Sequence, residues 1–169
     1  SAHSFDIVKS ILNVPVIEVI GAGASTAVLE TRNKKLGIIG TSATISSGTY
    51  QKAINKLDSN IETYHRACPL FVPLVEEGQE WWDSDIALRI AQEYLSPLKQ
   101  TGVDTLVLGC THYPLLYKTI SKVMGEEVRL VSSAFEVARV VKRMIFEKNI
   151  QRDEHCRPEY RYYTSDSVE

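Results

Sequence analysis

The fold of this chain is decided by residues 105–116, which read TLVLGCTHYPLL. Residues 106–108 are apolar and follow the β-branched Thr105, and the run has the length of a strand, which is typical of a strand buried on both faces. Pro114 is tolerated in the first turn of a helix, and apolar residues at helical spacing, Leu116 and Ile120 among them, follow it. The stretch therefore predicts a buried parallel strand that leads directly into a helix.

Cys110 follows the predicted strand and precedes the predicted helix. Open α/β sheets bind their ligands at the carboxyl ends of the strands. A helix N-terminus lowers the pKa of a thiol from roughly 8.5 toward neutrality. With His112 and a threonine hydroxyl nearby, Cys110 is suited to acid/base chemistry. The pattern leaves a second interpretation open, in which Cys110 is a buried core residue and His112 only a turn residue.

Strands and helices alternate along the rest of the chain. We predict strands at 15–20, 35–40, 61–65, 105–109 and 128–131, and an edge strand at 160–163. We predict helices at 5–12, from about 25 to 29, at 47–57, from 85 to about 101, after Pro114, and from 133 to about 145. Residues 68–78 contain two prolines and are predicted to be an apolar loop. This alternation predicts an α/β fold in which helices cover both faces of a parallel sheet in a three-layer lobe.

Length and composition exclude several classes of protein. The chain has 169 residues and a formal net charge of −2, so no basic excess indicates a nucleic-acid partner. No apolar run approaches the ~20 residues of a membrane span, so we expect no membrane partner. The three cysteines are widely spaced and form neither a metal-binding pattern nor a disulfide framework. We therefore expect a cytoplasmic protein in a reducing compartment.

Four polar or loop segments follow predicted strands: residues 41–44, 68–78, 110–112 and 132–133. In a doubly wound sheet these segments share one rim. Hydroxyls and backbone amides at helix starts bind carboxylate or phosphate groups readily, so we expect a small anionic ligand. The alternative for each single hydroxyl is a helix N-cap without a ligand.

Glu76 stands at the end of an apolar run, where a buried carboxylate can orient a catalytic partner. The alternative is a solvated loop end. No nucleotide cofactor is expected. Residues 21–23, Gly-Ala-Gly, lack the third glycine and the acidic residue of a dinucleotide fingerprint, and no Gly-Lys-Ser/Thr follows Thr41-Ser42.

Three motifs together resemble glutamate racemase. They are IGTSATI at 39–45, CPLFVPLVE at 68–76 and LGCTHYPL at 108–115, in the order of that family. The resemblance covers essentially the whole chain. It implies an isomerase that interconverts L- and D-glutamate without a cofactor or metal and supplies D-glutamate for peptidoglycan, and hence for cell-wall biogenesis and cell shape. Two cysteines, one on each side of the substrate α-carbon, remove and return the proton in that family.

The resemblance also implies roles for individual residues. Cys110 matches the second of the two cysteines, and Glu76 matches an acidic residue that orients His112. The positions that contact substrate or lie near its carboxylate are, by the same resemblance, Thr111, His112, Thr41 and Thr44.

The chain departs from the family pattern at its start and near residue 132. The family's first cysteine lies in a Cys-Asn-Thr-Ala segment, downstream of an Asp-Ser pair and a Tyr-Gly pair that bind substrate, and this chain has no counterpart of these segments. Ser1-Ala2 resembles the residues just after that cysteine. We therefore expect a chain that begins downstream of the first cysteine and is inactive alone. Ser132 stands where the family usually has aspartate.

The family folds as two similar lobes with the active site between them. By this resemblance residues 22–132 form the second lobe, and 1–21 and 133–169 are remnants of the first, incomplete lobe. The apolar residues of these remnants would lack their usual neighbours, which predicts a homo-oligomer or a strand-exchanged dimer.

Two other functions stay open from the sequence. One is a related racemase that acts on aspartate or a hydantoin, although the CPLFVPLVE segment favours glutamate. The other is a non-catalytic α/β fragment that binds a small carboxylate or a partner chain.

Overall fold

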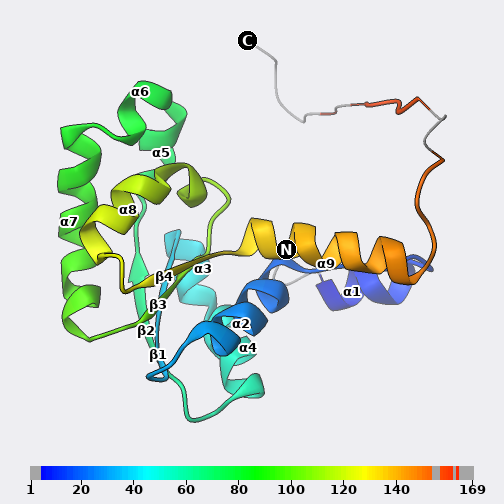
Figure 1. Cartoon of the computed structure of the whole chain (residues 1–169), viewed down its shortest axis with the longest axis horizontal. Coiled ribbons are helices and arrows are strands. Elements are labelled where there is room, and N and C mark those ends of the chain that lie inside the picture. The colour runs from blue at the N-terminus through cyan, green and yellow to red at the C-terminus, as the bar shows by residue number, and fades with distance from the viewer. Residues whose placement is uncertain (1–4, 154–156, 162, 164–169) are drawn as a thin grey trace.

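A four-stranded parallel sheet forms the centre of the molecule (Figure 1). The computed structural model describes residues 5–153, 157–161 and 163. The strand order is β2-β1-β3-β4. The strands are β1 (Lys35–Gly40), β2 (Glu62–Ala67), β3 (Thr105–Leu108) and β4 (Arg129–Ser132). The predicted α/β class and parallel sheet are confirmed, and these four strands lie within two residues of their predicted positions.

Helices cover both faces of the sheet, which gives three layers. On one face lie α5 (Phe71–Glu76), α7 (Asp85–Gln100), the 3₁₀ helix η1 (Tyr113–Leu116) and α8 (Tyr117–Met124). On the other face lie α2 (Val19–Glu30) and α4 (Thr49–Leu57). The short helix α3 (Ser42–Ser47) follows β1 and precedes α4, and the short helix α6 (Gln79–Trp82) packs on α5 and α7. Helices α1 (Phe5–Ile11) and α9 (Ser133–Glu147) begin and end the helical part of the described chain.

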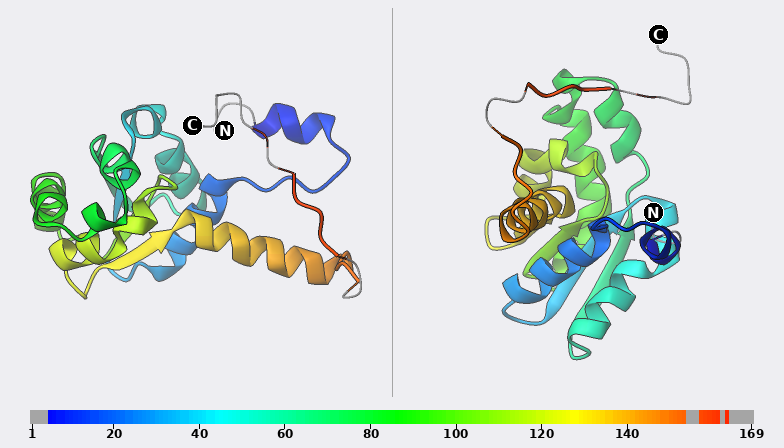
Figure 2. Two further views of the ribbon diagram at one scale, coloured as in Figure 1. Left: turned by 90° about the horizontal axis from the view of Figure 1, so that it is seen from above. Right: turned by 90° about the vertical axis from the view of Figure 1, so that its right-hand side faces the viewer.

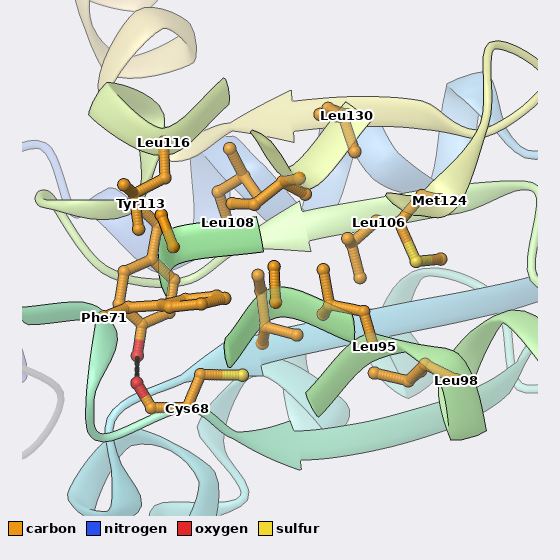
Figure 3. Close-up of a cluster of buried hydrophobic side chains, with 14 of the residues drawn as sticks. Cys68, Phe71, Leu95, Leu98, Leu106, Leu108, Tyr113, Leu116, Met124 and Leu130 are labelled. Atoms are coloured by element: carbon orange, nitrogen blue, oxygen red, sulfur yellow. Dashed lines mark hydrogen bonds between the residues drawn. The ribbon is translucent and has the colours of Figure 1, made fainter. Parts of the chain in front are cut away.

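Strand β3 is the most buried strand, because every one of its residues is buried. Its side chains alternate between two apolar clusters, with Leu106 and Leu108 on the α7 face and Val107 on the α4 face. The larger cluster, drawn in Figure 3, joins β3 to η1 and α5. Within it Phe71 packs edge-on against Tyr113, with ring centroids 5.2 Å apart, and the Tyr113 hydroxyl donates to the Cys68 carbonyl oxygen at 2.8 Å.

The direction of the connections reverses between β1 and β3. From β1 the chain leads outward through α3 and α4 to the edge strand β2, and from β3 it leads outward in the opposite sense through α8 to β4. Open α/β sheets form a crevice at the carboxyl ends of such a strand pair. The crevice here lies between the segments that follow Gly40 and Leu108.

The strand predicted at 15–20 is wrong. Residues 15–18 belong to neither helix nor strand, and α2 begins at Val19. The helix predicted from about 25 to 29 begins earlier than expected, because residues 19–24 also lie inside α2. The β-branched residues in this segment indicated a strand, but α2 packs closely on its neighbours through small residues, glycine and alanine. Gly23, Ala24 and Ala27 are its buried residues, and this packing compensates for the low helix propensity of glycine.

The loop predicted at 68–78 contains the helix α5 (Phe71–Glu76). Pro73 is its third residue, where the missing N–H would have no partner within the helix in any case. Phe71, Leu74 and Val75 are buried beneath η1 and α7. The prolines indicated a loop, whereas the helical spacing of these three apolar side chains carried the correct signal.

Three further expectations need correction. The helix predicted at 47–57 is α4 (Thr49–Leu57), and a separate helix, α3 (Ser42–Ser47), was not predicted; Gly48 at φ 61° separates the two. The Ser132 hydroxyl, predicted to cap α9, makes no capping bond. The edge strand predicted at 160–163 includes residue 162, which lies outside the described residues, and residues 160, 161 and 163 are not in a strand. The lobe boundaries at 22 and 132 stay a prediction.

Helices α1 and α9 extend away from the layered body (Figure 2). The N-terminal end of α9 packs on α2, where the Thr26 hydroxyl donates to the Glu136 carboxylate at 2.9 Å. Phe135, Val140 and Phe146 of α9 are exposed, as are Ile7 and Ile11 of α1. No described helix is long and apolar enough to cross a membrane.

Candidate functional site

A cavity of about 320 Å³ lies at the crevice between β1 and β3. Its walls come from the start of α2, from α3 and α4, from the residues that follow β3, and from the N-terminus of α9. The polar side chains that line it belong to Thr44, Ser47, Tyr50, Cys110, Thr111 and Ser133. A cavity of this size accommodates a small amino acid and lies where parallel sheets bind ligands.

Cys110 is the nucleophilic group of the cavity, and a chain of polar contacts leads from it to the surface. Its Sγ lies 3.8 Å from Nδ1 of His112. The other ring nitrogen of His112, Nε2, lies 3.3 Å from Oε1 of Glu76. The imidazole is one-third exposed and the Glu76 side chain 63% exposed, so the chain runs from a half-buried thiol to solvent.

The carboxylate decides which nitrogen of His112 carries the proton. The negative charge of an ionised carboxylate 3.3 Å from Nε2 favours the tautomer with the proton on that nitrogen. Nδ1 of the neutral ring is then an acceptor that faces the Cys110 thiol. The arrangement can take a proton from the thiol and return it, which is what an acid/base cysteine requires.

The three threonines of the predicted site have different surroundings. Thr44 and Thr111 line the cavity together with Cys110. The Thr41 hydroxyl accepts a hydrogen bond from the Thr44 backbone N–H at 3.2 Å and lies 3.0 Å from the Thr44 hydroxyl. Thr41 is therefore the N-cap of α3 and fixes the orientation of Thr44. Its role as a direct substrate ligand, like those of the other site residues, stays a prediction.

Gly109 places Cys110 in the crevice. Its backbone N–H donates to the Ile39 carbonyl oxygen at 2.8 Å, so the pairing of β3 with β1 continues up to the residue before the cysteine. A Cβ at position 109 would lie 2.7 Å from that same carbonyl oxygen and 3.1 Å from Cε2 of Tyr50. No side chain fits there, and the two strands and Tyr50 can close around the backbone only because residue 109 is glycine.

Two residues of the cavity wall were not recognised as part of a site from the sequence. They are Ser47 and Tyr50, which fall in the helix predicted at 47–57 and are not among the predicted site residues. Tyr50 is buried, and its hydroxyl lies 2.8 Å from the hydroxyl of Ser133. The available signal was the position of Tyr50 near the start of its helix. A tyrosine hydroxyl there can reach the rim of the sheet rather than the core.

The other cysteine in the described chain is unsuited to acid/base chemistry. Cys68 is fully buried in the larger apolar cluster, and burial raises the pKa of its thiol to about 12. It therefore stays protonated at neutral pH and serves as a packing residue. Cys156 lies outside the described residues. No three His, Cys, Asp or Glu side chains within the described part of the chain are placed to hold a metal ion.

A family model described as Asp/Glu/Hydantoin racemase matches residues 1–140. This chain belongs to that family. The glutamate racemase of Geobacter metallireducens is 46% identical to this racemase-family chain over 166 residues, which are 98% of the chain and 61% of the relative. The glutamate racemase of a Sulfurihydrogenibium species is 47% identical over 144 residues, or 85% of the chain and 54% of the relative.

Solved structures agree with this assignment. The racemase-family chain superimposes on the glutamate racemase of Francisella tularensis in complex with D-glutamate with a TM-score of 0.88 and 36% identity, covering 99% of the chain and 61% of that structure. For the isoform RacE1 of Bacillus anthracis the TM-score is 0.82 at 39% identity, over 88% of the chain and 55% of that structure. The chain thus spans between half and two-thirds of the length of these relatives.

Proposed function

We propose that this chain supplies one half of a glutamate racemase active site, with Cys110 as one of two acid/base residues. The observation that carries the proposal is the contact chain from the half-buried Cys110 thiol through His112 to Glu76, at the end of the central strand. The named relatives support glutamate as the substrate, and one structural neighbour holds D-glutamate.

The residues of the cavity suit this reaction. The Cys110 thiolate takes the α-proton from one face of glutamate, and the electron pair left on the α-carbon is delocalised into the adjacent carboxylate. In the reverse direction the Cys110 thiol gives that proton back. His112 moves the thiol proton to and from Cys110, and Glu76 keeps the imidazole in the tautomer that accepts it. Hydroxyls of Thr44 and Thr111 are placed to bind the carboxylate or amino group of the substrate.

Racemisation needs a second proton donor on the opposite face. The family resemblance assigns that role to a cysteine in a segment with no counterpart among these 169 residues. Cys68 is not a candidate, because it is fully buried in the larger apolar cluster and does not line the cavity. We therefore expect these 169 residues alone not to racemise glutamate.

The experiment uses a chimera in which the part of the Geobacter metallireducens racemase that precedes its matched segment is joined to this chain. The chimera should interconvert L- and D-glutamate, and the 169-residue polypeptide alone should not. Cys110→Ser should lower turnover of the chimera by a factor of roughly 10³ or more, because an alcohol is a far weaker acid than a thiol. Cys68→Ser serves as the matched control. A Cys110→Ser chimera with near wild-type turnover would remove Cys110 from the mechanism.

Activity on aspartate or a hydantoin is the second candidate, since the family model includes racemases of all three substrates. Presenting each substrate to the same chimera decides between them. A chimera that turns over none of them, while the polypeptide still binds glutamate, would favour the non-catalytic alternative.

We further propose a cytoplasmic location, a homo-oligomeric state and a role in supplying D-glutamate for peptidoglycan. The location is supported by the half-buried free thiol of Cys110, which the proposed chemistry requires in reduced form. The oligomeric state is supported by the exposed apolar side chains of α1 and α9.

A further inference from the structure

Tyr50 contacts both the segment that carries Cys110 and the helix that forms the opposite wall of the cavity. It is the second residue of α4 and is 4% exposed. Its ring lies against Gly109, where even a Cβ would come within 3.1 Å of Cε2. The backbone immediately before Cys110 is thus hydrogen-bonded to the Ile39 carbonyl oxygen and also lies against the Tyr50 ring.

The Tyr50 hydroxyl reaches the first residue of α9. It lies 2.8 Å from the Ser133 hydroxyl, and both groups are buried. The same Ser133 hydroxyl lies so close to α2 that a Cβ at Gly23 would approach it to 2.3 Å. Helices α2, α4 and α9 therefore meet at one pair of hydroxyls in the wall of the cavity.

Burial keeps the Tyr50 phenol neutral. Burial raises its pKa, as do the nearby Cys110 and Glu18, and the hydrogen bond with Ser133 opposes this only in part. At neutral pH the group is therefore a hydrogen-bonding partner, and it is no base for the substrate. A buried hydroxyl that loses its partner is costly, so the two hydroxyls are expected to act as a unit.

We infer that Tyr50 is a positioning residue for Cys110. Its ring sets the Gly109–Cys110 backbone in the crevice, and its hydrogen bond to Ser133 holds the N-terminus of α9 against the cavity. The side chain does not need to touch substrate for this role. The inference rests on the proposed function for its importance in catalysis, because it concerns the placement of the proposed acid/base thiol.

The test measures how fast iodoacetamide alkylates Cys110 in the folded 169-residue chain, with the modified cysteine identified by peptide mass mapping. Tyr50→Phe keeps the ring and removes only the hydroxyl, and Ser133→Ala removes the partner. Each should raise the alkylation rate by about two- to tenfold across neutral to alkaline pH, the range expected from loss of one hydrogen bond. The wall formed by the start of α9 is then less firmly held over the thiol.

The double variant Tyr50→Phe/Ser133→Ala should show the same rate as either single variant, because one bond is lost in all three. Tyr94→Phe is the matched control, since its hydroxyl bonds to the Leu70 backbone N–H, away from Cys110. A role in stability alone would lower the thermal midpoint and leave the rate in the folded state unchanged. Circular dichroism confirms folding first, and if Tyr50→Phe does not fold, Ser133→Ala alone decides.

Alkylation rates equal to that of the control, or effects that multiply in the double variant, would overturn the inference. The readout needs no racemase activity. If the chimera is inactive but the single and double variants all raise the alkylation rate equally, the proposed function is rejected and the positioning role of Tyr50 stands. If the chimera is active but the variants leave the alkylation rate unchanged, the proposed function stands and the positioning role is rejected.

Discussion

At the scale of single residues, the contact between His112 and Glu76 determines which ring nitrogen of His112 can accept the proton of the Cys110 thiol. Glu76 is largely exposed, so it selects a tautomer rather than holding a buried charge. Glu76→Gln should lower turnover of the chimera roughly tenfold, because the amide no longer requires the proton on Nε2, and this is less than the loss expected for a primary acid or base. The measurement is the initial rate of D-glutamate formation.

Glu77→Gln is the control for this change, since Glu77 is the exposed neighbour of Glu76 at the end of α5 and makes no ion pair with His112. If Glu76→Gln and Glu77→Gln turn over glutamate at the same rate, the Glu76–His112 contact has no part in the reaction.

The residues of the proposed reaction could be predicted from the sequence to different degrees. Cys110, His112 and Glu76 were found because each stands at the end of a recognisable apolar run, and the structure brings them into one contact chain. Tyr50 was missed because a tyrosine at helical spacing looks like a core residue until its hydroxyl partner is known. That partner, Ser133, lies 83 positions away, and no local pattern reports the contact.

At the scale of elements, the arrangement of the segments at the amino ends of the strands depends on hydrogen bonds to Asp104. Its carboxylate accepts hydrogen bonds from the Thr31 hydroxyl and from the backbone N–H groups of Arg32 and Asn33, each at 2.7 Å. The contact joins the end of α2 to the start of β3, at the opposite edge of the sheet from Cys110. Partial burial raises the pKa of Asp104, but these hydrogen bonds together outweigh it, so the pKa lies below its usual 3.8.

Asp104→Asn should therefore destabilise the fold at neutral pH, by on the order of 2 kcal/mol, because hydrogen bonds to a charged acceptor are lost. Since the folded-state pKa is the lower one, the stabilisation from Asp104 is present above pH 3.8 and is lost as pH falls through the folded-state value. Thermal unfolding followed by circular dichroism should show a midpoint difference between wild type and variant that is large at neutral pH and shrinks in acid.

Glu93→Gln, on the exposed side of α7, is the control for Asp104→Asn and should change the midpoint little at any pH. A midpoint difference for Asp104→Asn that is constant from neutral to acid pH would contradict the assigned ionisation.

Elements differ in how far local sequence determines them. Strands β1, β3 and β4 were predicted because each contains a short apolar run next to a turn, and the polar edge strand β2 was predicted from its alternating pattern. The segment that begins at Val16 also contains β-branched residues, yet it leads into α2, because Gly23 allows α2 to approach Ser133 of α9 more closely than any side chain permits. Such a packing contact between distant segments decides between helix and strand, and local propensity does not report it.

At the scale of the whole molecule, the layered body buries its core side chains, whereas α1 and α9 leave several apolar side chains exposed. Five apolar side chains of α9 recur at helical spacing and form one stripe along the helix. None of them is fully buried, and the five residues are Val137, Val140, Val141, Met144 and Ile145. Fully burying each such side chain would contribute about 1.5–3 kcal/mol. Exchange of a strand at 15–20 is no longer a reason to expect association, because the described chain has no strand there. The helical stripe remains one.

We therefore expect the 169-residue polypeptide to self-associate through α9 as its concentration rises. Val141→Lys combined with Ile145→Lys should shift it toward monomer, because two charges would have to be buried in the contact. Arg143→Glu, an exposed charge reversal on the same helix, is the control and should leave association unchanged. Light scattering after size-exclusion chromatography measures the mass of each species. A wild-type chain that stays monomeric at high concentration, with slow hydrogen exchange along 137–145, would show that the stripe is covered within one chain and that the lobe boundaries at 22 and 132 are wrong.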